Sequence, residues 1–122
     1  MTFVTADSCR RRLERLTQLL FSAFPGSTIY QHTDLFRVSH DVLSHKVDAV
    51  LLEAETEKMS SLDLIQKLRR ERPKLLVFII AKTHDLYEKA IAAGASGYFI
   101  MPDNEQNLLE AMRLLINKEN VS

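Results

Sequence analysis

The chain has 122 residues, enough for one domain, residues 1–122, that buries about two thirds of its unfolded surface without a disulfide or structural metal. Its 16 basic and 16 acidic side chains balance, so no overall field would attract nucleic acid or an anionic membrane. Cys9 is the single cysteine, the N-terminus lacks a charged-then-apolar signal layout, and no apolar run approaches the roughly 20 residues of a membrane span. We therefore expect a cytoplasmic protein without an internal disulfide.

Along the first half of the chain, short apolar runs alternate with segments of helical periodicity. The pattern predicts a strand at 1–5, a helix from Asp7 or Ser8 to Pro25-Gly26, an edge strand at 28–31, a helix that begins at Thr33 or Asp34, and a strand at 49–52. The side chains expected to face the core are Leu13, Leu16, Leu19, Leu20 and Phe24, then Leu35, Val38, Val42 and Leu43. The run at 49–52 is unbroken, which is typical of a central parallel strand.

The second half continues the same alternation. It predicts a helix capped by Ser60 or Ser61 and ended by Pro73, a strand at 75–80, a short helix at 84–93 closed by Gly94, a strand at 97–101, and a helix capped by Asp103. The inward side chains are Leu62, Ile65 and Leu68, then Leu108, Leu109, Met112, Leu115 and Ile116. Residues 116–122 are interpreted as a polar tail or the start of a linker.

Five strand-then-helix units in strict alternation predict an α/β fold, in which a parallel sheet has right-handed crossovers and helices on both faces. In open sheets of this kind, reacting groups sit outside the carboxyl ends of the strands. Three apolar runs end at Glu53, Ala81 and Met101. We therefore expect these three residues to lie side by side in one crevice.

Three segments carry a resemblance to a known family. Residues 48–53 (DAVLLE) resemble the strand of a receiver domain that ends at the phosphoryl acceptor, residues 59–62 resemble the following loop and helix start, and residues 94–102 (GASGYFIMP) resemble the fifth strand. The chain is thus similar to the receiver domains of two-component response regulators. The resemblance implies a flavodoxin-like, doubly wound (βα)5 fold with a five-stranded parallel sheet in the order 2-1-3-4-5.

The resemblance also implies three substitutions in the expected crevice. Glu53 occupies the position of the family's acceptor aspartate, and its extra methylene displaces a nucleophile whose placement is critical. Ala81 replaces a Thr or Ser that donates to a phosphoryl oxygen, and Met101 replaces a Lys that neutralises its charge. A methyl group and a thioether do neither. Glu53 is therefore a degenerate phosphoacceptor position, and Ala81 and Met101 are degenerate phosphoryl-contact positions.

Metal binding is affected in the same way. Receivers hold Mg²⁺ with the acceptor and two acidic residues near the first strand, where this chain has Asp7 and Ser8. Only Asp7 is acidic, so we expect no cofactor. The alternative is a weakly bound, hydrated Mg²⁺ at Asp7, Glu53 and a backbone carbonyl near Glu55, since that ion often uses only one or two carboxylates.

Two interpretations of Glu53 are open. It is either a built-in mimic of the phosphorylated state or a solvated carboxylate in a pocket that no longer works. We slightly favour the solvated carboxylate, because a mimic needs donors to orient it and neither Ala81 nor Met101 provides one. The family's Lys-Pro bond is often cis, which makes Pro102, after Met101, a candidate cis-proline.

By the same resemblance, protein partners would bind the fourth helix, the fifth strand and the fifth helix. The residues predicted on this face are Lys89, Tyr98, Asn104 and Glu105, and the face would also allow a homodimer. Tyr98 is interpreted as an immobile interface tyrosine. Thr83 is interpreted either as a substitute donor to the crevice or as a helix cap.

Basic and imidazole side chains elsewhere have simpler interpretations. Two basic clusters are interpreted as solvated helix faces because the net charge is balanced: Arg10, Arg11, Arg12 and Arg15, and Arg69, Arg70, Arg72 and Lys74. The histidines show no metal-site spacing and are expected to be scattered and exposed: His32, His40, His45 and His84.

The residues and the resemblance together favour a pseudo-receiver. It would be a phosphorylation-independent module that binds protein partners as the regulatory domain of a response regulator, and it would not be an enzyme. The first alternative is the N-terminal input domain of a DNA-binding transcription regulator, truncated here. The others are a still phosphorylatable, Mg²⁺-dependent receiver and a flavodoxin-like enzyme. The domain itself is not expected to contact nucleic acid or a membrane.

Overall fold

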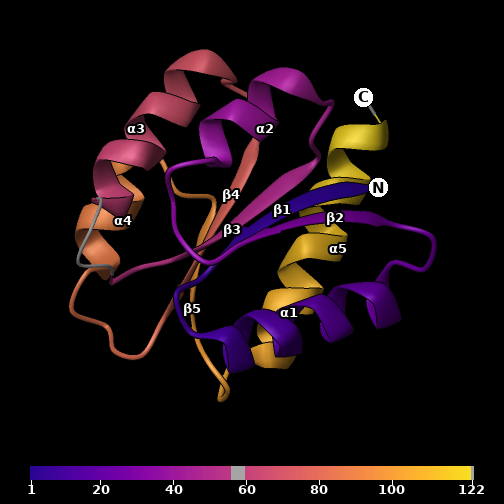
Figure 1. Cartoon of the computed structure of the whole chain (residues 1–122), viewed down its shortest axis with the longest axis horizontal. Coiled ribbons are helices and arrows are strands. Elements are labelled where there is room, and N and C mark those ends of the chain that lie inside the picture. The colour runs from indigo at the N-terminus through magenta and orange to yellow at the C-terminus, as the bar shows by residue number, and fades with distance from the viewer. Residues whose placement is uncertain (56–59, 122) are drawn as a thin grey trace.

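Strands and helices alternate along the chain (Figure 1). The computed structural model describes residues 1–55 and 60–121, so Met59 of the predicted segment 59–62 lies outside the described residues. The elements are β1 (Thr2–Ala6), α1 (Arg10–Ala23), β2 (Thr28–His32), α2 (Val38–Ser44), β3 (Ala49–Glu53), α3 (Ser61–Glu71), β4 (Leu76–Ala81), α4 (Tyr87–Ala93), β5 (Gly97–Ile100) and α5 (Glu105–Val121).

The five strands are parallel and form one sheet in the order β2-β1-β3-β4-β5. The predicted flavodoxin-like, doubly wound fold and its strand order are therefore confirmed. β3 lies between β1 and β4 and is buried along its whole length, as its unbroken apolar run predicts. The chain also forms β2 and β5 as the two edges of the sheet.

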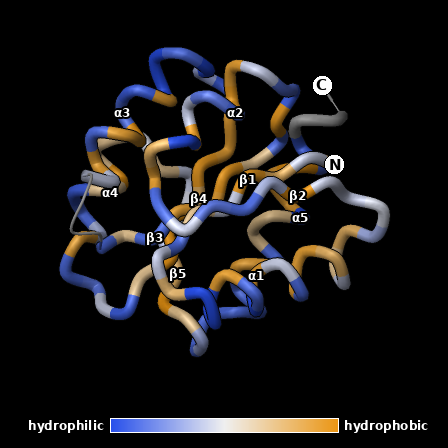
Figure 2. The backbone as a smooth tube through the Cα atoms, viewed as in Figure 1, coloured by the Kyte–Doolittle hydropathy of each residue, from blue (hydrophilic) through white to orange (hydrophobic). Residues whose placement is uncertain are grey.

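Two apolar layers lie on opposite faces of the sheet, because successive side chains of a strand point to opposite sides. In β3, Leu51 belongs to the layer under α1 and α5, and Leu52 belongs to the layer under α2, α3 and α4. Figure 1 shows these two groups of helices on either side of the sheet, and Figure 2 shows hydrophobic strands between helices with hydrophilic outer turns. By the same alternation, Glu53 follows Leu51 onto the face covered by α1.

Three predicted features of the helix ends can be compared directly. Ser60 caps α3, since its hydroxyl accepts a hydrogen bond from the Asp63 N–H at 3.3 Å. Gly94 closes α4 with a φ of 117°, in the left-handed region that favours glycine. α5 continues to Val121, through most of the segment 116–122 that is interpreted as a tail or the start of a linker.

The first two helices begin later than predicted because acidic side chains first stabilise local turns. Asp7 accepts a hydrogen bond from the Cys9 N–H at 2.8 Å, and α1 begins only after Cys9. Asp34 accepts one from the Phe36 N–H at 2.9 Å, and α2 begins at Val38. Leu43 does not face the core as predicted but is 54% exposed, because Val38 and Val42 form the buried side of α2 and the next residue along a helix points to another side.

The last two helices are also shorter at their start. Thr83 accepts a hydrogen bond from the Asp85 N–H at 3.3 Å, and α4 begins at Tyr87 rather than at residue 84. In α5, the residue before the first helical position is Asn104 rather than Asp103. These shifts leave the order of elements unchanged.

Candidate functional site

A crevice of about 960 Å³ opens at the carboxyl ends of the strands. The sheet register explains which residues meet there. Ala6 pairs with Leu52, so the next residues of both strands, Asp7 and Glu53, lie side by side. The crevice is lined from the β1–α1 loop, the first turn of α1, the β2–α2 loop, the ends of β3 and β4, and the start of α3. The lining residues include Ser8, Arg12, Glu53, Ser60, Ser61, Ala81 and Lys82.

Asp7 and Arg12 form an ion pair at the start of α1. The Asp7 side chain is fully buried, and the Arg12 side chain is only 16% exposed. The guanidinium contacts both carboxylate oxygens, because Nε donates to Oδ2 and Nη2 donates to Oδ1 over 2.9 Å. Hydrogen bonding to Asp7 is the main cause that raises the pKa of Arg12. This bidentate geometry is the strong form of an arginine–carboxylate contact.

Glu53 is 2% exposed, and its carboxylate is held mainly by Ser8. The Ser8 N–H donates to Oε1 and the Ser8 hydroxyl donates to Oε2, both over 2.9 Å. Arg12 adds a longer contact of 3.3 Å from Nη2 to Oε2. Burial raises the pKa of Glu53, while the two Ser8 hydrogen bonds and the Arg12 charge oppose that shift. The carboxylate is therefore oriented by three donors.

The favoured interpretation of Glu53 as a solvated carboxylate is wrong. Donors do orient it, and they come from Ser8 and Arg12 instead of Ala81 and Met101. For the same reason, Arg12 is not part of a solvated helix face. The prediction was wrong because it considered donors only at Ala81 and Met101, the positions where the resembling family has them.

The ends of β4 and β5 carry the apolar side chains of Ala81 and Met101. Ala81 lines the crevice and belongs to the buried layer under α2, α3 and α4. Met101 packs away from it, in the buried cluster that also contains Phe78 and Met112. The expectation that Met101 shares the crevice is therefore wrong, although its backbone does meet the end of β4, since the Met101 N–H donates to the Ala81 carbonyl over 3.1 Å. The Met101–Pro102 peptide bond is cis.

The residues in the crevice do not fit a divalent cation. The Arg12 guanidinium already occupies the position of a cation, since it donates to both oxygens of Asp7 and to Oε2 of Glu53. Mg²⁺ requires oxygen ligands in near-octahedral geometry, and N–H donors cannot serve as its ligands. Within residues 1–55 and 60–121, the structure contains no group of three His, Cys, Asp or Glu side chains that could hold a metal ion.

Tyr98 is half-buried, and its hydroxyl donates to the Thr83 carbonyl oxygen over 2.7 Å. Its ring meets Tyr87 edge-on at a centroid distance of 5.6 Å. Burial raises the pKa of Tyr98. The Thr83 hydroxyl lies 3.4 Å from Glu55 Oε1 and precedes α4 by several residues, so it neither caps that helix nor contacts Glu53.

Of the other residues predicted on the partner face, Lys89 is exposed, and Asn104 and Glu105 are partly buried. Asn104 Oδ1 accepts a hydrogen bond from the Ile100 N–H at 3.1 Å. Glu105 pairs with Arg15 of α1 at 2.8 Å. Asn104 and Glu105 therefore stabilise the turn into α5 and the contact between α5 and α1.

Sequence reasoning also missed Arg69 on α3. Its guanidinium donates to the carbonyl oxygens of Gly94, Pro73 and Leu75, over distances from 2.6 to 3.1 Å. Burial lowers the pKa of Arg69, because no carboxylate compensates for its lost hydration. This arginine ties the end of α3 to the loop before β4 and to the loop between α4 and β5.

A helical spacing could have identified both arginines. Arg12 precedes the buried Leu16 by four residues, and Arg69 follows the buried Ile65 by four. Side chains four apart lie on the same side of a helix. Among the histidines, His32 is not exposed as predicted, since its Nε2 contacts the buried Asp41.

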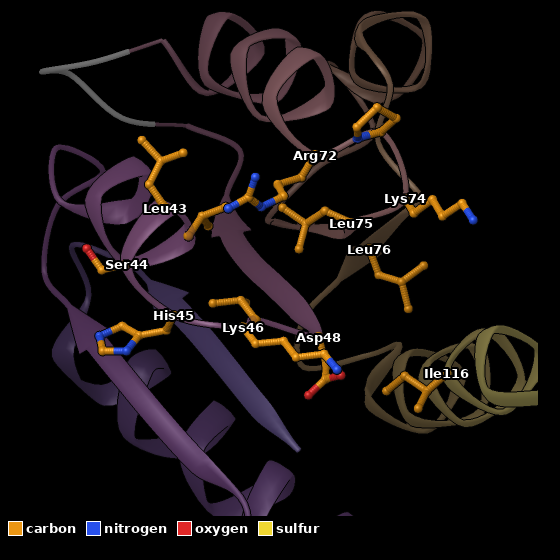
Figure 3. A pocket seen from close by; sticks show the side chains of 13 residues that line it. Leu43, Ser44, His45, Lys46, Asp48, Arg72, Lys74, Leu75, Leu76 and Ile116 are labelled. Carbon is orange, nitrogen blue, oxygen red and sulfur yellow. The ribbon is translucent and has the colours of Figure 1, made fainter.

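A second groove, of about 780 Å³, lies at the amino ends of β3 and β4 (Figure 3). Apolar side chains line it together with basic ones, including Leu75, Ile116, Lys46, Arg72 and Lys74. Its one acidic residue, Asp48, accepts a hydrogen bond from the Thr2 N–H at 2.7 Å. This groove thus lacks the paired carboxylates of the crevice.

Solved structures similar to this chain are receiver domains. The receiver domain of an HD domain-containing protein from Pseudomonas fluorescens Pf-5 has a TM-score of 0.87 and 27% identity, covering 99% of this chain and 98% of that one. The receiver domain of a DNA-binding response regulator (merR) from Colwellia psychrerythraea 34H has a TM-score of 0.86 and 20% identity, covering 96% and 98%. A CheY-like receiver from Methanospirillum hungatei JF-1 has a TM-score of 0.85 and 18% identity, covering 98% and 95%.

Sequence comparison with curated proteins gives a match over part of the chain. Over 89 residues the chain is 28% identical to stress response regulator protein 1 of Scheffersomyces stipitis, which covers 69% of this chain and 31% of that protein. The chain thus spans about a third of the length of this curated relative. No family model matches the chain. In the part of the chain that the structure describes, no helix is long and apolar enough to cross a membrane.

Proposed function

We propose that the chain, which has the fold of response regulator receiver domains, is a cytoplasmic signalling module that binds protein partners without being phosphorylated. The observation that carries this proposal is the state of the Glu53 carboxylate. It is buried, and both of its oxygens accept hydrogen bonds from Ser8 or Arg12. Transfer of a phosphoryl group requires a carboxylate oxygen that is free to approach phosphorus in line with the leaving group.

The surroundings of Glu53 also lack two groups that the resembling family uses to stabilise a transferring phosphoryl group. Ala81 has no hydroxyl, and Met101 has neither a positive charge nor a side chain in the crevice. Charge stabilisation by donors and cations supplies most of the catalysis in phosphoryl transfer. The crevice therefore lacks two contacts that phosphotransfer needs, and Glu53 acts as a built-in anionic group instead of an acceptor.

Incubation with acetyl phosphate and Mg²⁺, followed by intact-mass measurement, tests this proposal. A receiver domain with an intact acceptor aspartate serves as the positive control in the same buffer. We expect the control to gain a phosphoryl group and this chain to stay at its unmodified mass. A phosphoryl group mapped to Glu53 would overturn the proposal.

We place the partner-binding surface on α4, β5 and α5. On α4, Tyr87 is 46% exposed and Ile91 is 42% exposed, and the two lie one turn apart beside Tyr98. Exposed apolar side chains grouped in this way favour a protein contact. For a homodimer, light scattering at high concentration should give twice the chain mass. Ile91→Glu should abolish the dimer, whereas Leu43→Glu, at an equally exposed position on α2, should leave it intact; a monomeric parent chain contradicts the homodimer.

A second candidate is the input domain of a DNA-binding regulator. The similar receiver from Colwellia psychrerythraea is described as part of a DNA-binding response regulator, and the curated relative is about three times as long as the matched segment. Determining the full coding sequence tests this candidate directly. A coding sequence without a DNA-binding segment would exclude it.

A further inference from the structure

We infer that Arg12 acts as the protein's own permanent cation between Asp7 and Glu53, and that its guanidinium excludes divalent metal ions from a site which the two carboxylates would otherwise form. This inference deepens the proposed function and rests on it, because metal-assisted phosphorylation would need the space that Arg12 fills. The crevice differs from a metal site in that a guanidinium, instead of a metal ion, contacts both carboxylates.

The guanidinium of Arg12 reaches both carboxylates, with Nη2 at 2.9 Å from Asp7 Oδ1 and at 3.3 Å from Glu53 Oε2. Its Nε simultaneously contacts Asp7 Oδ2. The positive charge therefore lies between two buried acidic groups that come from neighbouring strand ends.

Arg12 balances part of the negative charge of the two carboxylates. Asp7 and Glu53 together carry two negative charges when ionised, and Arg12 supplies one positive charge within contact distance. Two buried carboxylates without a nearby cation are strongly unfavourable, and they attract a metal ion or a proton. Because Arg12 is covalently part of α1, its occupancy does not depend on the metal concentration of the surroundings.

Donors other than Arg12 also hold the two carboxylates. The Cys9 N–H holds Asp7 Oδ1 at 2.8 Å, and Ser8 holds both oxygens of Glu53. These donors fix the two carboxylates in place even without Arg12. Removing the guanidinium would thus leave two preoriented carboxylates next to a crevice that admits water, which is the donor set from which Mg²⁺ or Mn²⁺ is bound with several waters retained.

Manganese binding, measured by titration calorimetry and by the loss of the free Mn²⁺ signal in electron paramagnetic resonance, tests the inference. The variants are Arg12→Met, which keeps an unbranched apolar stem but removes the guanidinium and its charge, and Arg12→Met with Asp7→Asn. The matched control is Arg11→Met, which removes one positive charge from an exposed position on the same helix. We expect Arg12→Met to bind Mn²⁺ about tenfold or more tightly than the parent chain. The double variant and Arg11→Met should bind like the parent.

Two binding results would overturn the inference. One is a folded Arg12→Met that binds Mn²⁺ no more tightly than the parent chain, and the other is a gain of equal size in Arg11→Met. If Arg12→Met is unfolded in metal-free buffer, millimolar MgCl₂ should fold it and NaCl of equal ionic strength should not; a chain that stays unfolded in MgCl₂ also contradicts the inference. Since no phosphodonor is present, failure here is distinct from phosphorylation of Glu53 in the mass experiment.

Discussion

Arg12 and Arg69 come from helices on opposite faces of the sheet, and each donates at least three hydrogen bonds from a half-buried guanidinium. Their acceptors differ. Arg12 contacts the carboxylates of Asp7 and Glu53, whereas Arg69 contacts neutral backbone carbonyls. Accordingly, hydrogen bonding to Asp7 raises the pKa of Arg12, and burial lowers the pKa of Arg69.

The difference separates a site from a structural support. Around Arg12, the acceptors are charged groups that would be unstable without a cation, and they sit in a crevice open to ligands. Around Arg69, the acceptors are the carbonyls at the ends of α3 and α4, which any set of good donors could satisfy. Substitutions at the two arginines should therefore differ in size and in their response to metal ions.

The largest effect is expected for Arg12→Met in metal-free buffer. Breaking a buried pair leaves Asp7 and Glu53 without their cation, so we expect the free energy of unfolding to fall by about 3 kcal/mol. Urea denaturation followed by circular dichroism measures this change. Arg11→Met is the control and should change stability by less than about 0.5 kcal/mol. Equal losses in both variants would mean that Arg12 contributes only as a surface charge.

Arg69→Met should come second. The substitution removes charged donors from the Gly94, Pro73 and Leu75 carbonyls, at a cost of about 2 kcal/mol. The neighbouring, exposed Arg70→Met is the matched control. Added MgCl₂ should restore none of the stability lost in Arg69→Met, in contrast to Arg12→Met. A metal response at Arg69 would remove the distinction between the two arginines.

Periodicity predicted the order of elements and the sheet, because the apolar runs of β3 and β4 and the spacing of Leu16 and Leu20 are local features of the sequence. The position of the crevice could be predicted from the strand ends alone. The partners of Glu53 could not, since Ser8 and Arg12 reach it only through the pairing of β1 with β3. Contacts between residues more than forty positions apart leave no periodic signal.

A smaller effect is expected for Gly94→Ala, at the place where Arg69 closes the end of α4. Gly94 has a φ of 117°, and an added Cβ would lie 3.2 Å from Arg69 Cγ. We expect a loss of about 1 kcal/mol. In Arg69→Met the crowding by the arginine stem changes while the backbone strain stays, so a double-mutant cycle measures the coupling. Strict additivity would show that the cost is backbone strain alone.

The smallest effect is the pH dependence contributed by Glu53. Burial raises its pKa above the ordinary value of 4.5, so the folded state binds this proton more readily than the unfolded state. The associated stabilisation is complete below that ordinary value and is lost as the pH rises through the folded pKa. The free energy of unfolding of the parent chain should therefore fall relative to that of Glu53→Gln over this acid range, as measured by urea denaturation at each pH. If the free energy of unfolding of the parent chain instead rises relative to that of Glu53→Gln, Arg12 stabilises the Glu53 carboxylate more than burial destabilises it. The guanidinium would then stabilise Glu53 as strongly as it stabilises Asp7.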